Sequence, residues 1–307
     1  MKVPDVYGPL KEFFSGVTWP FTWLGTKAAS VGLLIFLFVF IAAAAAAGVG
    51  TLTDFGSSQP DSSLDTGELD PSCNVIGIEI RDCIMTYRPD NVEALTSSAD
   101  SPCDTITSSE EVVWMLDEAR YNSSIRAVVL QIDSGGGSPV AAEEVAAALK
   151  VLGKPSVAWV RQNAASAAYW IASAADTIIA SESSDIGSIG VTYSYVDNAK
   201  RNMRDGLTYN QLTTGKYKDT GTPDRALTND ERALIQRDLD ISLQAFIKAV
   251  ATNRELSVDK VTALADGSSM LGKMALKNGL IDQLGTKQEV WKQLSTDIND
   301  KPNVCWP

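Results

Sequence analysis

The most apolar part of the chain lies near its N-terminus. Residues 31–49 read VGLLIFLFVFIAAAAAAGV and carry no charge. About 20 consecutive apolar residues form a helix long enough to cross a bilayer. We therefore expect a transmembrane helix over residues 28–50, preceded by an N-terminal segment of residues 1–27.

Charge on either side of this apolar run predicts its orientation. Lys2, Lys11 and Lys27 precede it, whereas the first basic residue after it is Arg81. Because basic residues stay on the cytoplasmic side, we expect a single-pass protein of the cell membrane with a cytoplasmic N-terminus and an extracytoplasmic main domain. A cleaved signal peptide is the alternative, although its polar leader and its apolar core would both be unusually long.

Beyond the apolar run the pattern changes twice. Residues 51–72 are acidic and rich in Ser, Gly and Pro, which is typical of a linker. In residues 73–292, short apolar runs typical of buried strands alternate with segments of helical periodicity, and residues 293–307 form a C-terminal tail. We expect strands at 75–80, 127–132, 156–160, 177–180 and 189–193, and helices at 108–121, 141–152, 229–254, 258–265, 273–278 and 287–298. This alternation predicts an α/β fold with a mostly parallel sheet and helical cover.

Composition removes several classes of function. The 307 residues carry a net charge of −12, which argues against a nucleic-acid partner, because phosphate binding needs clustered Lys and Arg. The chain has no histidine and no CxxC pair, so we expect neither a metal site nor another cofactor. All the cysteines follow the apolar run, and in an exported domain they predict two disulfides with three pairings open: Cys73, Cys83, Cys103 and Cys305.

Two segments carry candidate chemistry. Ser166 stands among alanines in QNAASAAYWIASAAD, just before a helical pattern, where it is either packing filler or an exposed nucleophile. The DSGGGS run of residues 133–138 follows a buried strand and precedes a helix. Consecutive backbone N–H groups in such a loop can hold a phosphate or an oxyanion, but a plain glycine-rich turn has the same pattern.

The absence of histidine limits the bases available to a serine nucleophile. Triads that use histidine are excluded, whereas a Ser-Lys pair is not. A lysine serves as a base near neutral pH only where desolvation lowers the pKa of its ammonium group. Lys216 and Lys218, in the loop TTGKYKDTGTP, are the candidates, although both also fit an ordinary solvated surface.

Four segments together resemble one enzyme family. QIDSGGGS, NAASAAYWIASAADTIIA, IGSIGV and TTGKYKD occur in the order in which the signal peptide peptidase A family, the S49 type of serine peptidase, has patterns close to NSPGGS, AASGGYY, GSIGV and SGxxKD. The resemblance covers about residues 74–292. It implies a fold similar to Clp protease and crotonase, built from repeated ββα units.

The resemblance also implies a role for individual residues. Ser166 matches the nucleophile, and Lys218, directly before an aspartate, matches the general base, which leaves Lys216 as a bystander. Ser188 matches a serine whose hydroxyl orients the lysine amine. The backbone N–H groups of Gly137 and Ala167 match the oxyanion hole.

Two positions depart from the family pattern. The Gly-Gly pair that usually follows the nucleophile is Ala167-Ala168 here, which keeps both N–H groups but adds two methyl groups. The proline that usually precedes the glycines is replaced by Gly135, which loosens the loop. Neither change removes a reacting group.

The resemblance implies a membrane-anchored serine endopeptidase that hydrolyses apolar peptides, such as cleaved signal peptides, through an acyl-enzyme. Single-copy relatives form homo-oligomeric rings whose serine and lysine come from neighbouring subunits, so a ring is implied here too. The main alternative is a non-catalytic, membrane-tethered scaffold or binding ring of the same fold. Two weaker alternatives are a crotonase-like acyl-CoA enzyme and an aspartic protease, since DTG occurs at 65–67 and 219–221.

Overall fold

The computed structural model describes residues 72–89, 103 and 105–307. The expected transmembrane helix over residues 28–50 and its flanking segments lie outside this part of the chain. Among the described helices, none has the length and apolar character needed to cross a membrane.

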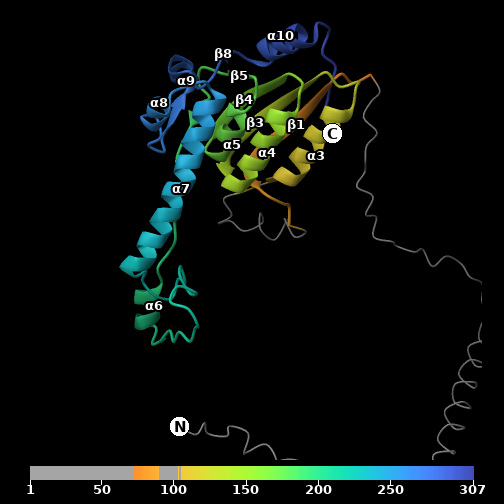
Figure 1. The fold of residues 1–307 in the computed structure, drawn as a ribbon. Coiled ribbons are helices and arrows are strands. Elements are labelled where there is room, and N and C mark those ends of the chain that lie inside the picture. Colours follow the sequence, from red (N-terminus) through yellow and green to blue (C-terminus); the bar gives the residue numbers. More distant parts are fainter. Residues whose placement is uncertain (1–71, 90–102, 104) are drawn as a thin grey trace, which may run out of the picture. The chain divides into compact units, whose positions relative to one another are not determined.

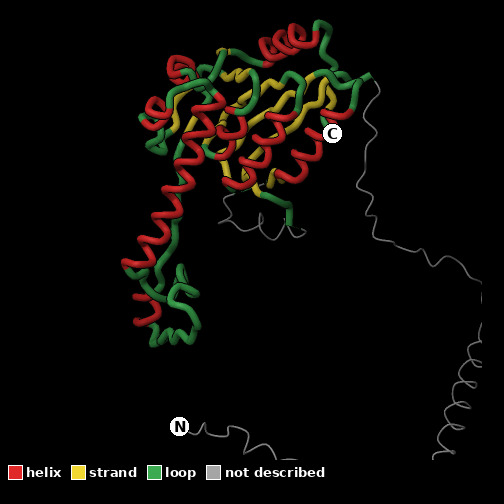
Figure 2. Tube along the Cα trace, viewed as in Figure 1, coloured by secondary structure: helices red, strands yellow, loops and turns green. Residues whose placement is uncertain are grey.

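The described residues fold around one sheet of nine strands with a mostly parallel centre, so the predicted α/β class is confirmed (Figures 1 and 2). The main strand order is β2-β1-β3-β4-β5-β8, and each of these neighbours pairs in parallel. The strands are β1 (Val75–Met85), β2 (Ile106–Ser108), β3 (Ala127–Gly137), β4 (Ser156–Ala165), β5 (Thr177–Ala180), β6 (Asp185–Gly187), β7 (Ser269–Leu271), β8 (Gln283–Leu284) and β9 (Val304–Cys305). The helices are α3 (Ser109–Tyr121), α4 (Pro139–Val151), α5 (Ala167–Ser173), α6 (Ala199–Arg204), α7 (Asn229–Asn253), α8 (Val258–Thr262), α9 (Gly272–Asn278) and α10 (Lys287–Ile298).

Successive apolar side chains of the long strands point to opposite faces of the sheet, and each face is buried in its own core. On one face, residues such as Ile78, Leu130 and Val160 are buried with α3, α4 and α5. On the other face, a smaller cluster that includes Val129 and Val157 is buried under α10. Burial on both faces explains why these strands read as continuous apolar runs in the sequence.

Strands β3 and β4 each consist of two pairing segments and are each followed directly by a helix. The register of β3 against β4 shifts between Ile132 and Ser134. Residues 157–160 of β4 pair with β5, whereas residues 163–165 pair with β6. Each long strand with its helix therefore corresponds to one of the expected ββα units.

The prediction of a strand at residues 189–193 is wrong. The strand in this region is β6, at residues 185–187, and the chain leaves the sheet at Ser188, whose φ is +49°. The backbone N–H of Ser188 donates to the carbonyl of Ser268 at 3.0 Å, so the chain turns toward the β7 segment after Gly187. A run of β-branched residues favours a strand, but this backbone turn overrides the local preference.

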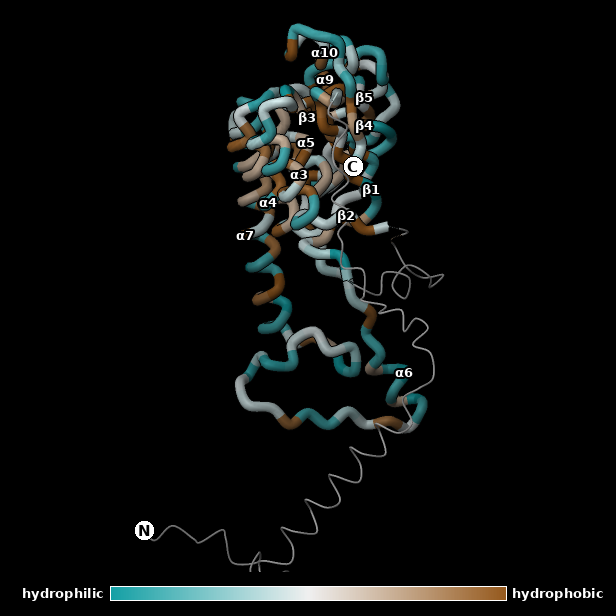
Figure 3. Tube along the Cα trace, turned by 90° about the vertical axis from the view of Figure 1, so that its right-hand side faces the viewer, coloured by the Kyte–Doolittle hydropathy of each residue, from teal (hydrophilic) through white to brown (hydrophobic). Residues whose placement is uncertain are grey.

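Beyond this turn, residues 190–242 form an arm that extends away from the sheet (Figure 1). Only the C-terminal part of α7 packs on the body, through Phe246, Ile247 and Val250, while α6 lies at the far end of the arm. Hydrophobic residues are scattered along the arm (Figure 3). Among the exposed ones are Met203, at 78% exposure, and Leu212, at 100%.

Two disulfides join the described cysteines, which confirms the number expected from the sequence. Cys73 pairs with Cys305, and Cys83 pairs with Cys103. The first bond, together with the pairing of β9 with β1, fixes the C-terminal residues to the start of the domain.

Candidate active site

Ser166 occupies a sharp turn between β4 and α5. Its backbone has φ +53° and ψ −125°, a conformation that residues with a side chain rarely adopt. The turn is held by two backbone hydrogen bonds: the N–H of Ser166 donates to Gly187 at 2.8 Å, and the N–H of Trp170 donates to Ser166 at 3.0 Å. Within the described residues the Ser166 hydroxyl has no hydrogen-bond partner, although the residue is only partly exposed. Such strained, over-determined positions cluster at functional sites.

The glycine loop at the end of β3 lies directly against this serine. A Cβ at Gly136 would lie 2.8 Å from the Cβ of Ser166 and 3.0 Å from the N atom of Ala167, and Gly136 has φ +113°. A Cβ at Gly137 would lie 2.0 Å from the carbonyl oxygen of Ile84 on β1. Only glycine fits at either position, and the absence of both side chains brings the loop backbone next to the nucleophile candidate.

Ser134 ties the glycine loop to the sheet. Its buried hydroxyl donates to the carbonyl of Asp82 on β1 and accepts the N–H of Gly136 at 3.1 Å. The N–H of Ser138, at the other end of the loop, donates to Ile84 at 2.7 Å. Both ends of the loop are therefore anchored on β1.

The structure brings Ser188 next to Ser166. Ala165 pairs with Gly187 in the parallel β4–β6 ladder, so the two serines follow paired residues. The Ser188 hydroxyl donates to the carbonyl of Gly267 at 3.0 Å. Its oxygen can still accept a hydrogen bond, which is what orienting an amine would require.

A cavity of about 510 Å³ opens beside these residues. Trp170 and Phe246, stacked at 4.8 Å between ring centroids, form part of its apolar wall with Leu243. The residues that line it are Gly135, Gly137, Pro139, Ser166, Ala167, Trp170, Ser188, Gly190, Val191, Thr192, Leu243, Phe246, Ala265, Asp266 and Gly267. Four of the five predicted site residues therefore line one cavity.

This cavity has no adequate base of its own. Asp266 is the only ionisable residue in its described lining. The side chain and the backbone N–H of Ser268 both donate to this carboxylate, at 2.6 and 2.9 Å, and they hold the pKa of Asp266 below its usual range. A carboxylate stabilised in this way is a poor proton acceptor for a serine hydroxyl.

Lys218, the fifth predicted residue, does not lie with the others in the chain. Its side chain is exposed and lies on the segment that folds beside α6, at the end of the arm away from α5 (Figure 1). Its neighbour Lys216 donates to Asp230 at 2.6 Å and lies over the ring of Tyr217. The hydrogen bond to Asp230 raises the pKa of Lys216, which leaves that lysine charged.

The turn that carries Lys218 is fixed by a residue that the sequence analysis missed. Glu231, which is 2% exposed, accepts hydrogen bonds from both terminal nitrogens of Arg225 at 2.6 and 2.8 Å. It also accepts the N–H and hydroxyl of Thr228 at 2.8 and 2.9 Å, and Arg225 donates in turn to the carbonyl of Asp219. The Arg225 hydrogen bond, followed by that of Thr228, lowers the pKa of Glu231. The T-x-x-E spacing at the start of the predicted helix was a readable signal for this capping box.

Comparison with known proteins relates much of the chain to peptidases. The model of peptidase family S49 matches residues 148–300. The chain is 34% identical to the protein MJ0651 of Methanocaldococcus jannaschii over 187 residues, which are 60% of either chain. It is 28% identical to Protease 4 of Haemophilus influenzae over 64% of this chain and 32% of that one. It is 31% identical to the chloroplastic serine protease SPPA of Arabidopsis thaliana over 57% of this chain and 26% of that one. The aligned region therefore spans less than two thirds of each of these relatives.

A solved structure shares the fold. A lysine-to-alanine mutant of the 1510-N membrane-bound stomatin-specific protease, in complex with a substrate peptide, aligns with a TM-score of 0.51 and 15% identity. The alignment covers 77% of this chain and 92% of that one. The family model, the relatives and the order of the four motifs agree: this chain belongs to peptidase family S49, the signal peptide peptidase A family.

Proposed function

We propose that the protein is a membrane-anchored serine endopeptidase in which Ser166 is the nucleophile and Lys218 of a neighbouring copy is the general base. One observation carries the proposal. Among the residues that the structure describes, the cavity beside Ser166 is lined by a glycine loop and a serine hydroxyl without a hydrogen-bond partner but by no basic side chain, whereas Lys218 lies exposed on an arm that extends from the body. A second chain whose arm reaches this cavity would supply the missing base and would desolvate the lysine at the same time.

The reaction would follow the usual course of acyl transfer. The neutral Nζ of Lys218 takes the proton of the Ser166 hydroxyl as Oγ attacks the peptide carbonyl carbon. The N–H groups of Gly137 and Ala167 stabilise the oxyanion that forms, and each such donor contributes roughly 3–4 kcal/mol in other serine enzymes. Collapse of this intermediate breaks the peptide bond, and the leaving amine takes the proton from Lys218. Water, activated by the same lysine, then releases the acyl group.

Ser188 would position the base in this scheme. Its hydroxyl proton is committed to Gly267, so its oxygen is available to accept an N–H of the incoming amine. The apolar wall of Trp170, Phe246 and Leu243 favours apolar peptide segments, such as those of cleaved signal peptides. A transmembrane helix over residues 28–50 would hold the site close to such substrates.

Labelling by a fluorophosphonate probe tests the proposal. Wild-type protein should be labelled on Ser166, as mapped by mass spectrometry of the digested protein. Ser166→Ala should not be labelled and should remain folded, because the hydroxyl makes no hydrogen bond in the described structure. Failure of the folded wild-type assembly to label would favour the non-catalytic scaffold.

A further inference from the structure

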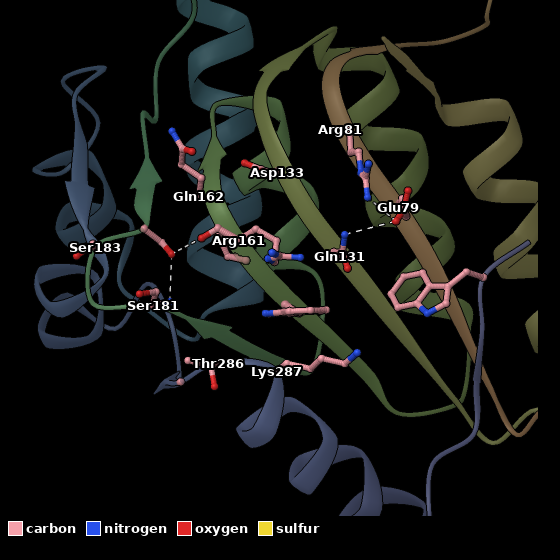
Figure 4. A pocket seen from close by; sticks show the side chains of 15 residues that line it. Glu79, Arg81, Gln131, Asp133, Arg161, Gln162, Ser181, Ser183, Thr286 and Lys287 are labelled. Atoms are coloured by element: carbon pink, nitrogen blue, oxygen red, sulfur yellow. Dashed lines mark hydrogen bonds and ion pairs between the residues drawn. The ribbon is translucent and has the colours of Figure 1, made fainter. Parts of the chain in front are cut away.

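A second and larger cavity lies on the opposite face of the sheet from α3, α4 and α5. Its volume is about 900 Å³. Figure 4 shows Glu79 and Arg81 of β1, Gln131 of β3 and Arg161 of β4 projecting from this face, with Lys287 at the start of α10 beside them. We call this cavity the polar trough. Helix α10 covers the apolar part of the face, and the trough occupies the part that it leaves open.

The unpaired charge of the trough is mainly positive. Glu79 is engaged by Arg81 at 2.6 Å. In the part of the chain that the structure describes, Arg161 and Lys287 have no carboxylate partner, and each lies over a tryptophan ring, at 4.7 and 4.6 Å from its centroid. Asp133 is the remaining carboxylate, and it accepts the backbone N–H of Asn163 at 3.1 Å. Two free cations stand out in a chain whose net charge is −12.

A third cavity lies between the polar trough and the candidate active site and shares lining residues with each. This intermediate cavity, of about 490 Å³, shares Gly135 with the cavity beside Ser166, and it shares with the trough Arg81, Gln131, Asp133, Arg161 and Gln162. Apart from Gly135 and its two chain neighbours, no atom of the described residues lies within 4 Å of the position that a Cβ would take at Gly135. No side chain therefore stands between the two cavities at Gly135, and a polypeptide bound in both would pass over the backbone of this residue.

We infer that the polar trough binds an acidic segment of the polypeptide substrate, while an apolar segment of the same chain occupies the cavity at Ser166. This inference rests on the proposed peptidase function and specifies its substrate class. Arg161 and Lys287 are the groups that would pair with carboxylates of the substrate, and opposite charge at the rim of a site also speeds encounter. The trough suits a polar chain because side-chain amides, hydroxyls and charges line most of it.

The test compares peptides that share one cleavable apolar core. The first peptide is the apolar core alone. The second carries a run of aspartates and serines at one end or the other, and the third has lysines in place of those aspartates. At low salt, the acidic extension at one end should lower KM about 5-fold relative to the core, because two exposed ion pairs contribute modestly. Arg161→Ala and Lys287→Ala should each raise the KM for the acidic peptide part of the way back to that of the bare core, with kcat unchanged. Cleavage of the bare core should be the same in both variants as in wild type. Arg120→Ala is the matched control, since this exposed arginine of α3 also lies over an aromatic ring, that of Tyr121.

A binding measurement separates failure of this inference from failure of the proposed function. Full-length Ser166→Ala protein is titrated into the fluorescein-labelled acidic peptide, and fluorescence anisotropy is recorded. Tighter binding of the acidic peptide than of the lysine peptide, lost in Arg161→Ala and weakened by 0.5 M salt as expected for exposed ion pairs, supports the inference even if no peptide is cleaved. Equal KM and equal binding for the acidic and lysine extensions would overturn it even if the core is cleaved.

Discussion

Gly136 and Ser166 lie so close that a Cβ on the glycine would be 2.8 Å from the Cβ of the serine. This contact links the glycine loop of β3 to the strained turn between β4 and α5. The candidate nucleophile and the candidate oxyanion donors can therefore lie this close together only because residue 136 is a glycine.

Replacing Gly136 by alanine should remove most activity and also lower stability. The methyl group would press on Ser166, and φ +113° is unfavourable for any residue with a side chain. We expect kcat to fall at least about 10-fold, because oxyanion donors act only when correctly placed. Gly135→Ala controls for stability, since its methyl group would meet no atom of the described residues beyond its chain neighbours within 4 Å, so its unfolding temperature should match that of wild type. An active, fully stable Gly136→Ala variant would contradict this account of the loop.

Glu231 should make the end of the arm sensitive to acid. Its pKa is lowered in the folded protein by Arg225 and Thr228, so its contribution to stability is complete above its unfolded pKa of about 4.3. That contribution is lost progressively as the pH falls from there through the folded pKa.

A pH series with Glu231→Gln measures this effect. Thermal unfolding midpoints of wild type and variant should differ most between pH 5 and pH 7 and should converge as the pH falls below about 4. Asp230→Asn is the neighbouring control, because among the described residues its carboxylate forms an ion pair only with the exposed Lys216. A gap between wild type and Glu231→Gln that stays constant down to acidic pH would show that the carboxylate does not act through its charge.

The two disulfides should differ in their contribution to stability. Cys73 and Cys305 are 232 residues apart, and Cys83 and Cys103 are 20 apart. Chain-entropy arguments assign roughly 5 kcal/mol to the longer loop and roughly 3 kcal/mol to the shorter one. The paired serine variant Cys73→Ser/Cys305→Ser should therefore unfold at lower denaturant concentration than Cys83→Ser/Cys103→Ser. The reverse order would contradict the chain-entropy argument.

The shorter disulfide has a second expected effect. Ile84, directly after Cys83, pairs with Gly137 and accepts the N–H of Ser138, so the end of β1 supports the glycine loop. Cys83→Ser/Cys103→Ser should lower kcat under conditions in which the protein is fully folded, whereas Cys73→Ser/Cys305→Ser should not.

Much of the fold could be predicted from the sequence because it depends on local patterns. The runs AVVLQI and TIIA are strands in the structure, and helices predicted at 229–254 and 287–298 match α7 and α10 within one residue. The extension of β3 through Gly137 could not be predicted, because glycines have low strand propensity and are held there by pairing with β1. The strand expected at 189–193 failed for a similar reason, since a turn at Ser188 decides the path of the chain.

The candidate site was predictable only in part. Ser166, Ser188, Gly137 and Ala167 belong to motifs next to strands, and the sheet brings strand ends together. The position of Lys218 depends on how the loop before α7 folds back onto the start of that helix, and no apolar periodicity encodes this path. Arg225 and Glu231 are six residues apart and pair only because the helix cap folds the loop back.

The sharing of Ser166 and Lys218 between copies is tested most directly by mixing two inactive variants. Ser166→Ala and Lys218→Ala are purified separately, shown to be folded and inactive, dissociated, mixed in equal amounts and allowed to reassemble. Random assembly should place an intact serine beside an intact lysine at about a quarter of the sites, so about a quarter of wild-type peptidase activity should return. Absence of any activity in mixed assemblies that match wild type in size, while wild type itself cleaves the peptide, would contradict a shared site.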